Sequence, residues 1–199
     1  LRLAINSTYS EQGYPRGGIG SITDCIMNSF PKNVDVRINT SVEKIESKNN
    51  GFIIYTGEKN YTSNAIVYSG EAKTLPELMA MPADWTTSAK LLKQSNAITI
   101  WLGLQNPISA FNYRGSEVRF DVGVPYWAMP VTGYDAGLAP KGMQLIGFTT
   151  FMDASENAKN IEKKYLETIY SVSPEIETNV IMKHAQIMVP EKAAVSVGV

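Results

Sequence analysis

The order of strand and helix patterns along the chain constrains its fold more than any other feature. Segments rich in alternating apolar, β-branched and aromatic residues outnumber segments with helical spacing. The helical patterns fall singly between groups of strands, and no internal repeat or low-complexity stretch is present. This order predicts an α+β fold, in which a mixed β-sheet is covered by a few helices and a small three-stranded β-meander stands beside it.

The predicted strands fall into two groups along the chain. They cover 34–38, 42–47, 52–56, 61–70, 97–104, 116–122, 143–151 and 178–188. Asn49–Gly51 and Gly57 supply the turns of the meander, because Asn and Gly tolerate positive φ. The end of the third meander strand, 65–70, is the most apolar of the first group, and we expect it to be the most buried.

The first predicted helix covers 18–30. Its apolar residues recur at helical spacing, and Pro31 stops it. Two short helices follow, one capped by Thr74 and the other over 86–93. The longest helix begins near residue 153 and ends at Ser173 and Pro174. Its predicted cap is Asp153 or Ser155 with Glu156 completing a capping box, and its predicted buried stripe is Ala158, Ile161, Tyr165 and Ile169.

Composition excludes several classes of function. Apolar residues make up 44% of the chain, which permits a packed core, and the net charge of −1 with no basic patch argues against nucleic-acid binding. Cys25 is the one cysteine, so a disulfide framework is excluded and a reducing compartment such as the cytoplasm is expected. We expect its side chain to be a small buried thiol. His184 is the one histidine and is expected to be an ordinary strand residue, so no metal site is predicted.

Motifs for common catalytic sites are also missing. The sequence holds neither a Gly-x-Ser-x-Gly elbow nor a phosphate-binding loop, and its aspartates are scattered. No apolar run reaches the length of a membrane span. The chain opens on Leu1, in a pattern typical of the end of a helix, and we expect it to be a piece of a longer protein.

Four longer motifs occur in a fixed order. They are "GYPRGGIGSITDCI" from Gly13, "VRINTSVEKIES" from Val36, "AIVYSGEAKTLPELM" from Ala65 and "PVTGYDAGLAPKGMQLIGF" from Pro130. In order and spacing they resemble the phytoene desaturase-like branch of the FAD-dependent amine oxidase superfamily, from Gly13 to about Pro190. Members of that family begin with a Gly-x-Gly-x-x-Gly unit that this sequence does not hold.

The resemblance implies a division of the chain. Residues 14–72 would be a partial FAD-domain segment, with the Gly-Gly helix, a strand and the meander, and residues 73–190 a substrate-domain segment. Residues 1–13 and 191–199 would be flanking ends of a longer chain. Most pyrophosphate contacts of FAD would lie outside this piece, so the resemblance implies no tight flavin binding by these residues alone.

The resemblance also implies site residues. FAD contacts would come from Gly17, Gly18, Val42, Ser69 and Gly70. The helix that follows the glycine pair would begin near the flavin ring, where its free N–H groups and missing Cβ atoms suit a planar ligand. A glycine turn that merely starts a helix, a core valine and a plain strand-to-helix turn are the structural alternatives.

Substrate contacts are predicted at Tyr14 and Arg16, and no catalytic residue is named. An apolar cavity could be lined by the aromatic and apolar side chains Trp101, Phe111, Tyr113, Tyr126, Trp127 and Met129, which otherwise would belong to the core. The apolar, loop-like stretch 122–131 could contact a membrane surface, where a lipid substrate would enter.

The function implied by the resemblance is that of a FAD-dependent oxidoreductase that oxidises an apolar small molecule, an isoprenoid or a cyclic amine-like compound, by hydride transfer to flavin. Two alternatives remain open at this point. One is a non-catalytic binding protein of the same fold, similar to Rab GDP-dissociation inhibitors. The other is a free-standing interaction module.

Overall fold

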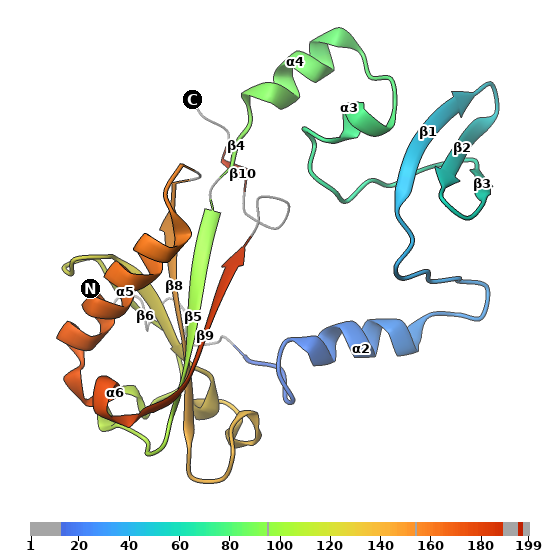
Figure 1. Cartoon of the computed structure of the whole chain (residues 1–199). Helices are drawn as coiled ribbons and strands as arrows, with labels where there is room; N and C mark the ends of the chain where they lie inside the picture. The colour runs from blue at the N-terminus through green and yellow to red at the C-terminus, as the bar shows by residue number, and fades with distance from the viewer. Residues whose placement is uncertain (1–12, 95, 154, 189–194, 197–199) are drawn as a thin grey trace. The chain divides into compact units, whose positions relative to one another are not determined.

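The computed structural model describes residues 13–94, 96–153, 155–188 and 195–196 (Figure 1). These residues form two compact units, and each is described by itself. The first comprises residues 13–30 and 96–188, and the second comprises residues 31–94 together with 195–196. The helix end predicted at Leu1 lies outside the described residues.

The first unit is built on a five-stranded sheet with the order β6-β7-β8-β5-β9. Its strands are β5 (Asn96–Leu104), β6 (Glu117–Arg119), β7 (Tyr126–Pro130), β8 (Gln144–Met152) and β9 (Val180–Met188). Every strand pair in it is antiparallel, and β5 lies between β8 and β9 from Ala97 to Leu104. Alternate residues of each strand therefore point to opposite faces.

One face of this sheet carries the core. Ile98, Ile100, Leu102 and Leu104 of β5 are fully buried on it. The helices α5 (Ala158–Val172) and α6 (Pro174–Asn179) cover this face (Figure 1), and Tyr165, Ile169 and Ile176 pack against the β5 residues. The remaining helical elements of the unit are α2 (Gly20–Ser29) and three 3-10 turns, η1 (Ser109–Phe111), η2 (Val131–Gly133) and η3 (Ala136–Leu138).

The second unit contains the meander β1 (Val42–Lys48), β2 (Gly51–Thr56) and β3 (Asn60–Ser63), which pair in that order. Two helices, α3 (Leu75–Leu78) and α4 (Ala83–Leu91), follow it. The short strands β4 (Lys93–Gln94) and β10 (Val195–Ser196) pair with each other. Ile45 of β1 and Thr56 of β2 are the buried residues of the meander.

The α+β class, the separate three-stranded meander and the long strands β5, β8 and β9 are confirmed. The helix predicted over 18–30 is confirmed as α2, and the long helix predicted to end at Ser173 is confirmed as α5. The short helix predicted over 86–93 begins earlier, at Ala83. A helix also forms after Thr74, but the Thr74 hydroxyl bonds Glu71 O and Tyr68 and makes no cap bond.

Three predictions about strands are wrong. Residues 34–38 form no strand, because no described segment pairs with them, and Ile38 is 78% exposed. The third meander strand ends at Ser63 because its hydroxyl accepts a hydrogen bond from Ala65 N, 3.2 Å away, in a local turn. Residues 65–70 are consequently not the most buried segment, since Val67 is 96% exposed. The stretch 122–131 is not a loop throughout, because it contains β7.

Two predictions about side chains are also wrong. Asn157, rather than Asp153 or Ser155, caps α5, and its side chain accepts hydrogen bonds from Lys159 N and Asn160 N. One of the two bonds of the predicted box does form one turn earlier, where Asp153 N donates to Glu156 Oε2 over 2.8 Å. Cys25 is exposed on α2 rather than buried.

Candidate functional site

The glycine pair that precedes α2 forms a tight turn, here called the glycine turn and defined as residues 15–18. Gly18 N donates to Pro15 O over 3.0 Å. Gly17 has φ +81° and Gly18 has φ +89°, a left-handed conformation that residues with a Cβ rarely adopt. Glycine at both positions is therefore required by the backbone.

A carboxylate from a distant loop holds this turn. Gly17 N donates to Asp135 Oδ2 over 2.9 Å, across 118 positions of sequence. The second oxygen, Oδ1, accepts from Gly137 N over 2.9 Å, which opens the η3 turn. The bonds from Gly17 and Gly137 hold the pKa of the Asp135 carboxyl below its ordinary value, and Arg16 lowers it further. We call these two bonds the Asp135 tether.

Side chains on both segments complete the contact. The rings of Tyr14 and Tyr134 lie 5.7 Å apart between centroids. A Cβ on Gly18 would lie 3.4 Å from Leu138, in ordinary contact range. Burial raises the pKa of the half-buried Tyr14 hydroxyl, and a backbone hydrogen bond from Ile19 opposes that shift. Two motifs far apart in the sequence thus form one site, with Tyr14, Arg16, Gly17 and Gly18 together.

The charge of the site limits what it can hold. The Gly17 amide already bonds a carboxylate, so this turn does not offer the anion cradle of a phosphate-binding loop. It offers a surface free of Cβ atoms, at the start of a helix whose first turn has no side-chain cap. Such a surface fits the flat face of a ring better than it fits a phosphate.

The second face of the five-stranded sheet, opposite the core, carries aromatic and apolar side chains. The strand register places Met129, Gly147, Trp101 and His184 in one row across β7, β8, β5 and β9. A Cβ on Gly147 would lie 2.8 Å from the Trp101 ring, so the indole packs directly over this glycine. Trp127 is 41% exposed on the same face. We call this surface the Trp101 face.

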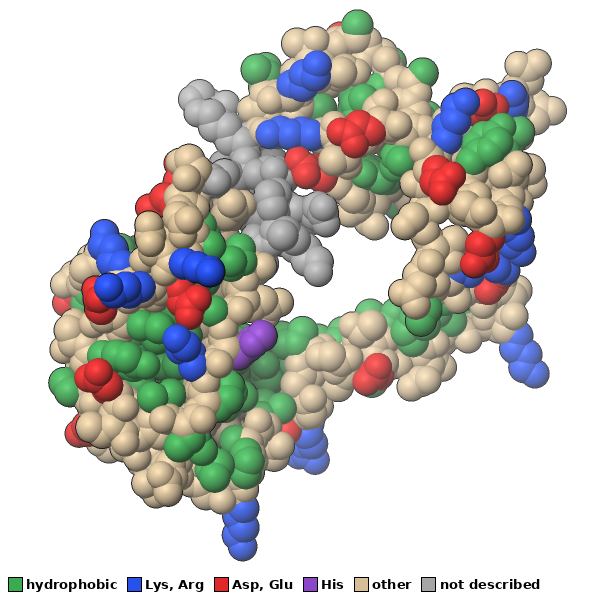
Figure 2. Space-filling model, in the orientation of Figure 1, with side chains coloured by type: hydrophobic (Ala, Val, Ile, Leu, Met, Phe, Trp, Pro, Cys, Tyr) green, Lys and Arg blue, Asp and Glu red, His purple; other side chains and the backbone are tan. Residues whose placement is uncertain are grey.

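The aromatic residues that could line a cavity divide between the two faces. Phe111 and Tyr126 belong to the core, where each packs edge-on against Phe148 with ring centroids 5.5 Å apart. Tyr113 packs against this core from its edge. Trp101, Trp127 and Met129 lie on the Trp101 face. His184, drawn purple in Figure 2, is exposed on β9.

A hollow of about 560 Å³ lies beside the loop that carries the tether. Gly137, Lys141 and Gln144 are among its lining residues. The buried Gln144 amide is occupied on both sides, because it accepts from Ile108 N over 3.1 Å and donates to Phe111 O over 3.0 Å. This side chain therefore fixes the loop at residues 107–112.

The other predicted FAD contacts belong to the second unit. Val42 opens β1, is 39% exposed, and precedes a register shift opposite Thr56. Ser69 and Gly70 are exposed in the irregular segment after β3. A Cβ on Gly70 would lie 2.4 Å from the Tyr68 hydroxyl, so a larger residue there would require the Tyr68 side chain to move. The FAD contacts of these three residues stay a prediction.

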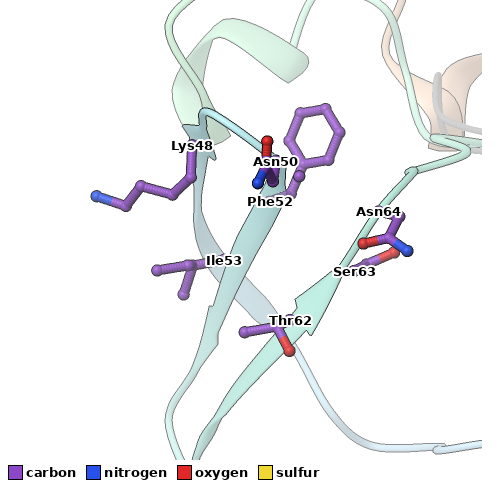
Figure 3. Close-up of a pocket in the computed structure, with 8 residues that line it drawn as sticks. Lys48, Asn50, Phe52, Ile53, Thr62, Ser63 and Asn64 are labelled. Atoms are coloured by element: carbon purple, nitrogen blue, oxygen red, sulfur yellow. The ribbon is translucent and has the colours of Figure 1, made fainter.

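A hollow of about 390 Å³ at the end of the meander contains none of the predicted site residues (Figure 3). Its lining includes Phe52, Ile53 and Thr62, and Lys48 is its one charged residue. Lys48 Nζ lies 3.1 Å from Glu46 Oε2, so this charge is already paired. Elsewhere among the described residues, no three His, Cys, Asp or Glu side chains come together to hold a metal ion.

Sequence reasoning missed the residues that hold the glycine turn. Asp135, Tyr134 and Leu138 lie in the motif "PVTGYDAGLAPKG", which the resemblance picked out without assigning it a role. The one local signal was Asp135 two positions before Gly137, a spacing at which an Asp side chain closes a turn onto a backbone amide. Its bond to Gly17 has no sequence signal.

The fold is shared with solved structures of several enzymes. An oxidoreductase from Methanosarcina mazei aligns with a TM-score of 0.71 and 22% identity, over 86% of this chain. A putrescine oxidase redesigned in its cofactor binding aligns with a TM-score of 0.66 and 10% identity, over 85% of this chain. A fatty acid isomerase from P. acnes that produces CLA aligns with a TM-score of 0.60 and 9% identity, over 86% of this chain.

This chain spans only part of those enzymes, namely 42%, 38% and 39% of their respective chains. No protein-family model matches the sequence. No curated protein matches it either. At these identities the likeness shows the fold alone.

Proposed function

We propose that the chain is the central part of an oxidoreductase that uses FAD to oxidise an apolar small molecule by hydride transfer. The observation that carries the proposal is the match to an oxidoreductase fold over 86% of the chain with a TM-score of 0.71. The glycine turn supports it, because it joins a Cβ-free surface to the start of a helix. Membership of the phytoene desaturase-like branch is a finer proposal, which rests on the four sequence motifs.

The residues present fit a flavin at the glycine turn. Gly17 and Gly18 would let the ring approach the backbone, and Asp135 keeps that backbone in place. Val42, Ser69 and Gly70 are proposed as further FAD contacts from the second unit. When bound, FAD supplies the acceptor for the hydride, and the protein supplies orientation and exclusion of water.

The proposed substrate contacts lie in the first unit. Tyr14 and Arg16 flank the glycine turn, with Tyr14 half-buried and Arg16 exposed. Trp101 offers a rigid indole on the Trp101 face, and Trp127 and Met129 extend the apolar surface. Aromatic side chains of this kind bind an apolar substrate at low cost in conformational entropy.

The proposal includes partners and a location. An apolar small molecule is the proposed partner. A role in nucleic-acid binding is not proposed, because the net charge is −1. A cytoplasmic protein with peripheral membrane contact through residues 122–131 is proposed, since Trp127 of β7 is 41% exposed. No helix in the described part of the chain is long and apolar enough to cross a bilayer. Liposome flotation of the complete gene product tests the contact, and lack of association contradicts it.

Substrate oxidation is tested by mixing the complete, FAD-loaded gene product with isoprenoids under anaerobic conditions. We expect the visible flavin absorbance to bleach with a suitable substrate. Trp101→Ala should raise the substrate concentration needed to bleach the flavin by about tenfold, because apolar contact with the substrate is lost. Trp85→Ala, the same change on α4, is the control and should leave this concentration unchanged. A loaded protein that no apolar compound bleaches contradicts the proposed reaction.

A further inference from the structure

We propose that Asp135 is the positioning residue of the glycine turn, which it holds in the conformation that receives the ligand. This inference rests on the proposed function, because the ligand in question is FAD. It goes beyond that function by assigning the geometry of the site to one side chain from a distant loop. That side chain makes no predicted contact with substrate or cofactor itself.

The first step of the argument is the flexibility of the turn. Glycine at positive φ costs little, but glycine also populates many other conformations when nothing holds it. Gly17 and Gly18 are both exposed or half-exposed, and the bond from Gly18 N to Pro15 O closes the turn only locally. The long-range bond from Gly17 N to Asp135 fixes the turn against the sheet unit.

The second step is that both carboxylate oxygens are used. Oδ2 accepts from Gly17 and Oδ1 accepts from Gly137, each over 2.9 Å. Asn in the same place would present one oxygen and one NH2 group, so one backbone N–H would face another donor. The site therefore requires Asp, although Asn has the same shape.

The third step is charge. The carboxylate is held ionised by its two amide donors, with Arg16 as the charged group beside it. A hydrogen bond to a charged acceptor is stronger than a neutral one. The same negative charge disfavours a phosphate at Gly17. We therefore assign the turn to the ring of the ligand.

The test uses the complete gene product and the variant Asp135→Asn. Asp153→Asn is the matched control, because Asp153 Oδ1 also closes a turn, by accepting from Ser155 N over 3.0 Å. Three readouts are compared, namely the affinity for added FAD by fluorescence titration, the shape of the bound flavin spectrum, and the rate of trypsin cleavage after Arg16. The last needs no flavin, because Gly17 N belongs to the bond that trypsin cuts.

We expect Asp135→Asn to weaken FAD binding and to speed cleavage after Arg16, each by about tenfold, the effect of losing one charged hydrogen bond. The flavin spectrum should also change, which a general loss of stability would not cause. Asp153→Asn should match the unchanged protein in all three readouts. Wild-type affinity and spectrum in Asp135→Asn overturn the positioning role.

The failure of the proposed function gives a different result. If the unchanged protein takes up no FAD, the oxidoreductase proposal fails, and cleavage after Arg16 alone decides whether Asp135 holds the turn. Faster cleavage in Asp135→Asn than in Asp153→Asn then supports the tether. Equal rates in the two variants overturn it.

Discussion

The buried hydroxyl of Tyr165 destabilises the core that the ring of the same residue fills. Its side chain is fully buried between α5 and the sheet, and burial raises the pKa of its hydroxyl. That hydroxyl has no hydrogen-bond partner among the described residues. A buried, unsatisfied polar group costs about 1–3 kcal/mol.

Tyr165→Phe should therefore raise the free energy of unfolding by about 1 kcal/mol, measured by urea denaturation of the complete gene product. Tyr113→Phe is the control with the opposite sign. The Tyr113 hydroxyl donates to the buried Glu117 carboxylate over 3.3 Å, so its loss should destabilise the fold by about 1–3 kcal/mol. A destabilising Tyr165→Phe would show that the hydroxyl is satisfied.

At this scale the sequence predicted part of the site and missed the rest. The glycine pair was recognisable because helix starts and positive φ leave local signals in residue type. Asp135 was not, since a bond across 118 positions depends on how the loop before β8 packs. The burial of Cys25 was wrongly predicted from its place near the apolar side of a helix that in fact exposes Ile22 and Ile26.

At the scale of single elements, a substitution can show which residue caps the N-terminus of α5. The Asn157 side chain accepts from Lys159 N at 3.0 Å and from Asn160 N at 3.3 Å. Asn157→Ala should lower the free energy of unfolding by about 1 kcal/mol in urea denaturation. Ser155→Ala, at one of the two cap positions predicted from the sequence, should cost less than half as much. A larger loss from Ser155→Ala would contradict the observed cap.

The meander provides a prediction about pH. Bonds from Lys44, Lys48 and Tyr55 lower the pKa of the Glu46 carboxyl from 4.5 to about 2. Because the folded pKa is lowered, this carboxylate stabilises the fold above the unfolded pKa and ceases to do so as the pH falls towards 2. Glu46→Gln should flatten the loss of meander stability between pH 4.5 and pH 2.

Hydrogen exchange of the β1 and β2 amides at several pH values measures this effect. Glu58→Gln, the same change of charge in the turn between β2 and β3, is the control and should keep the wild-type slope. The effect is modest, because Glu46 is at the surface and exposed ion pairs are screened. An unchanged slope in Glu46→Gln would contradict the assignment of the shift to this carboxyl.

Most of the strands that pair within the described residues were predicted. β5, β8 and β9 carry enough β-branched and aromatic residues to be recognised alone, and β5 pairs with β8 over nine residues and with β9 over eight. Residues 34–38 alternate equally well but have no described partner, and pairing rather than alternation makes a strand. β7 was missed because it is only five residues long, ends at Pro130 and follows Pro125, a pattern that resembles a loop.

At the scale of the whole molecule, the α+β class followed from element order, while the two-unit division did not. Residues 13–30 join residues 96–188 through contacts that include the Asp135 tether, which no sequence boundary marks. The predicted division at residue 72 into FAD-domain and substrate-domain segments stays a prediction. The three enzymes named above align over 42%, 38% and 39% of their chains, which leaves 58–62% of each enzyme outside the alignment. The domain division depends on that unaligned part.

The central claim is that these residues are part of a flavin-dependent enzyme, and one measurement tests it most directly. The visible absorption spectrum of the complete gene product is recorded after gel filtration with added FAD, beside that of residues 1–199 alone. We predict flavin peaks that co-elute with the complete protein and a colourless shorter piece. A folded, colourless complete protein that takes up no FAD would contradict the claim and favour a non-catalytic binding protein of the same fold.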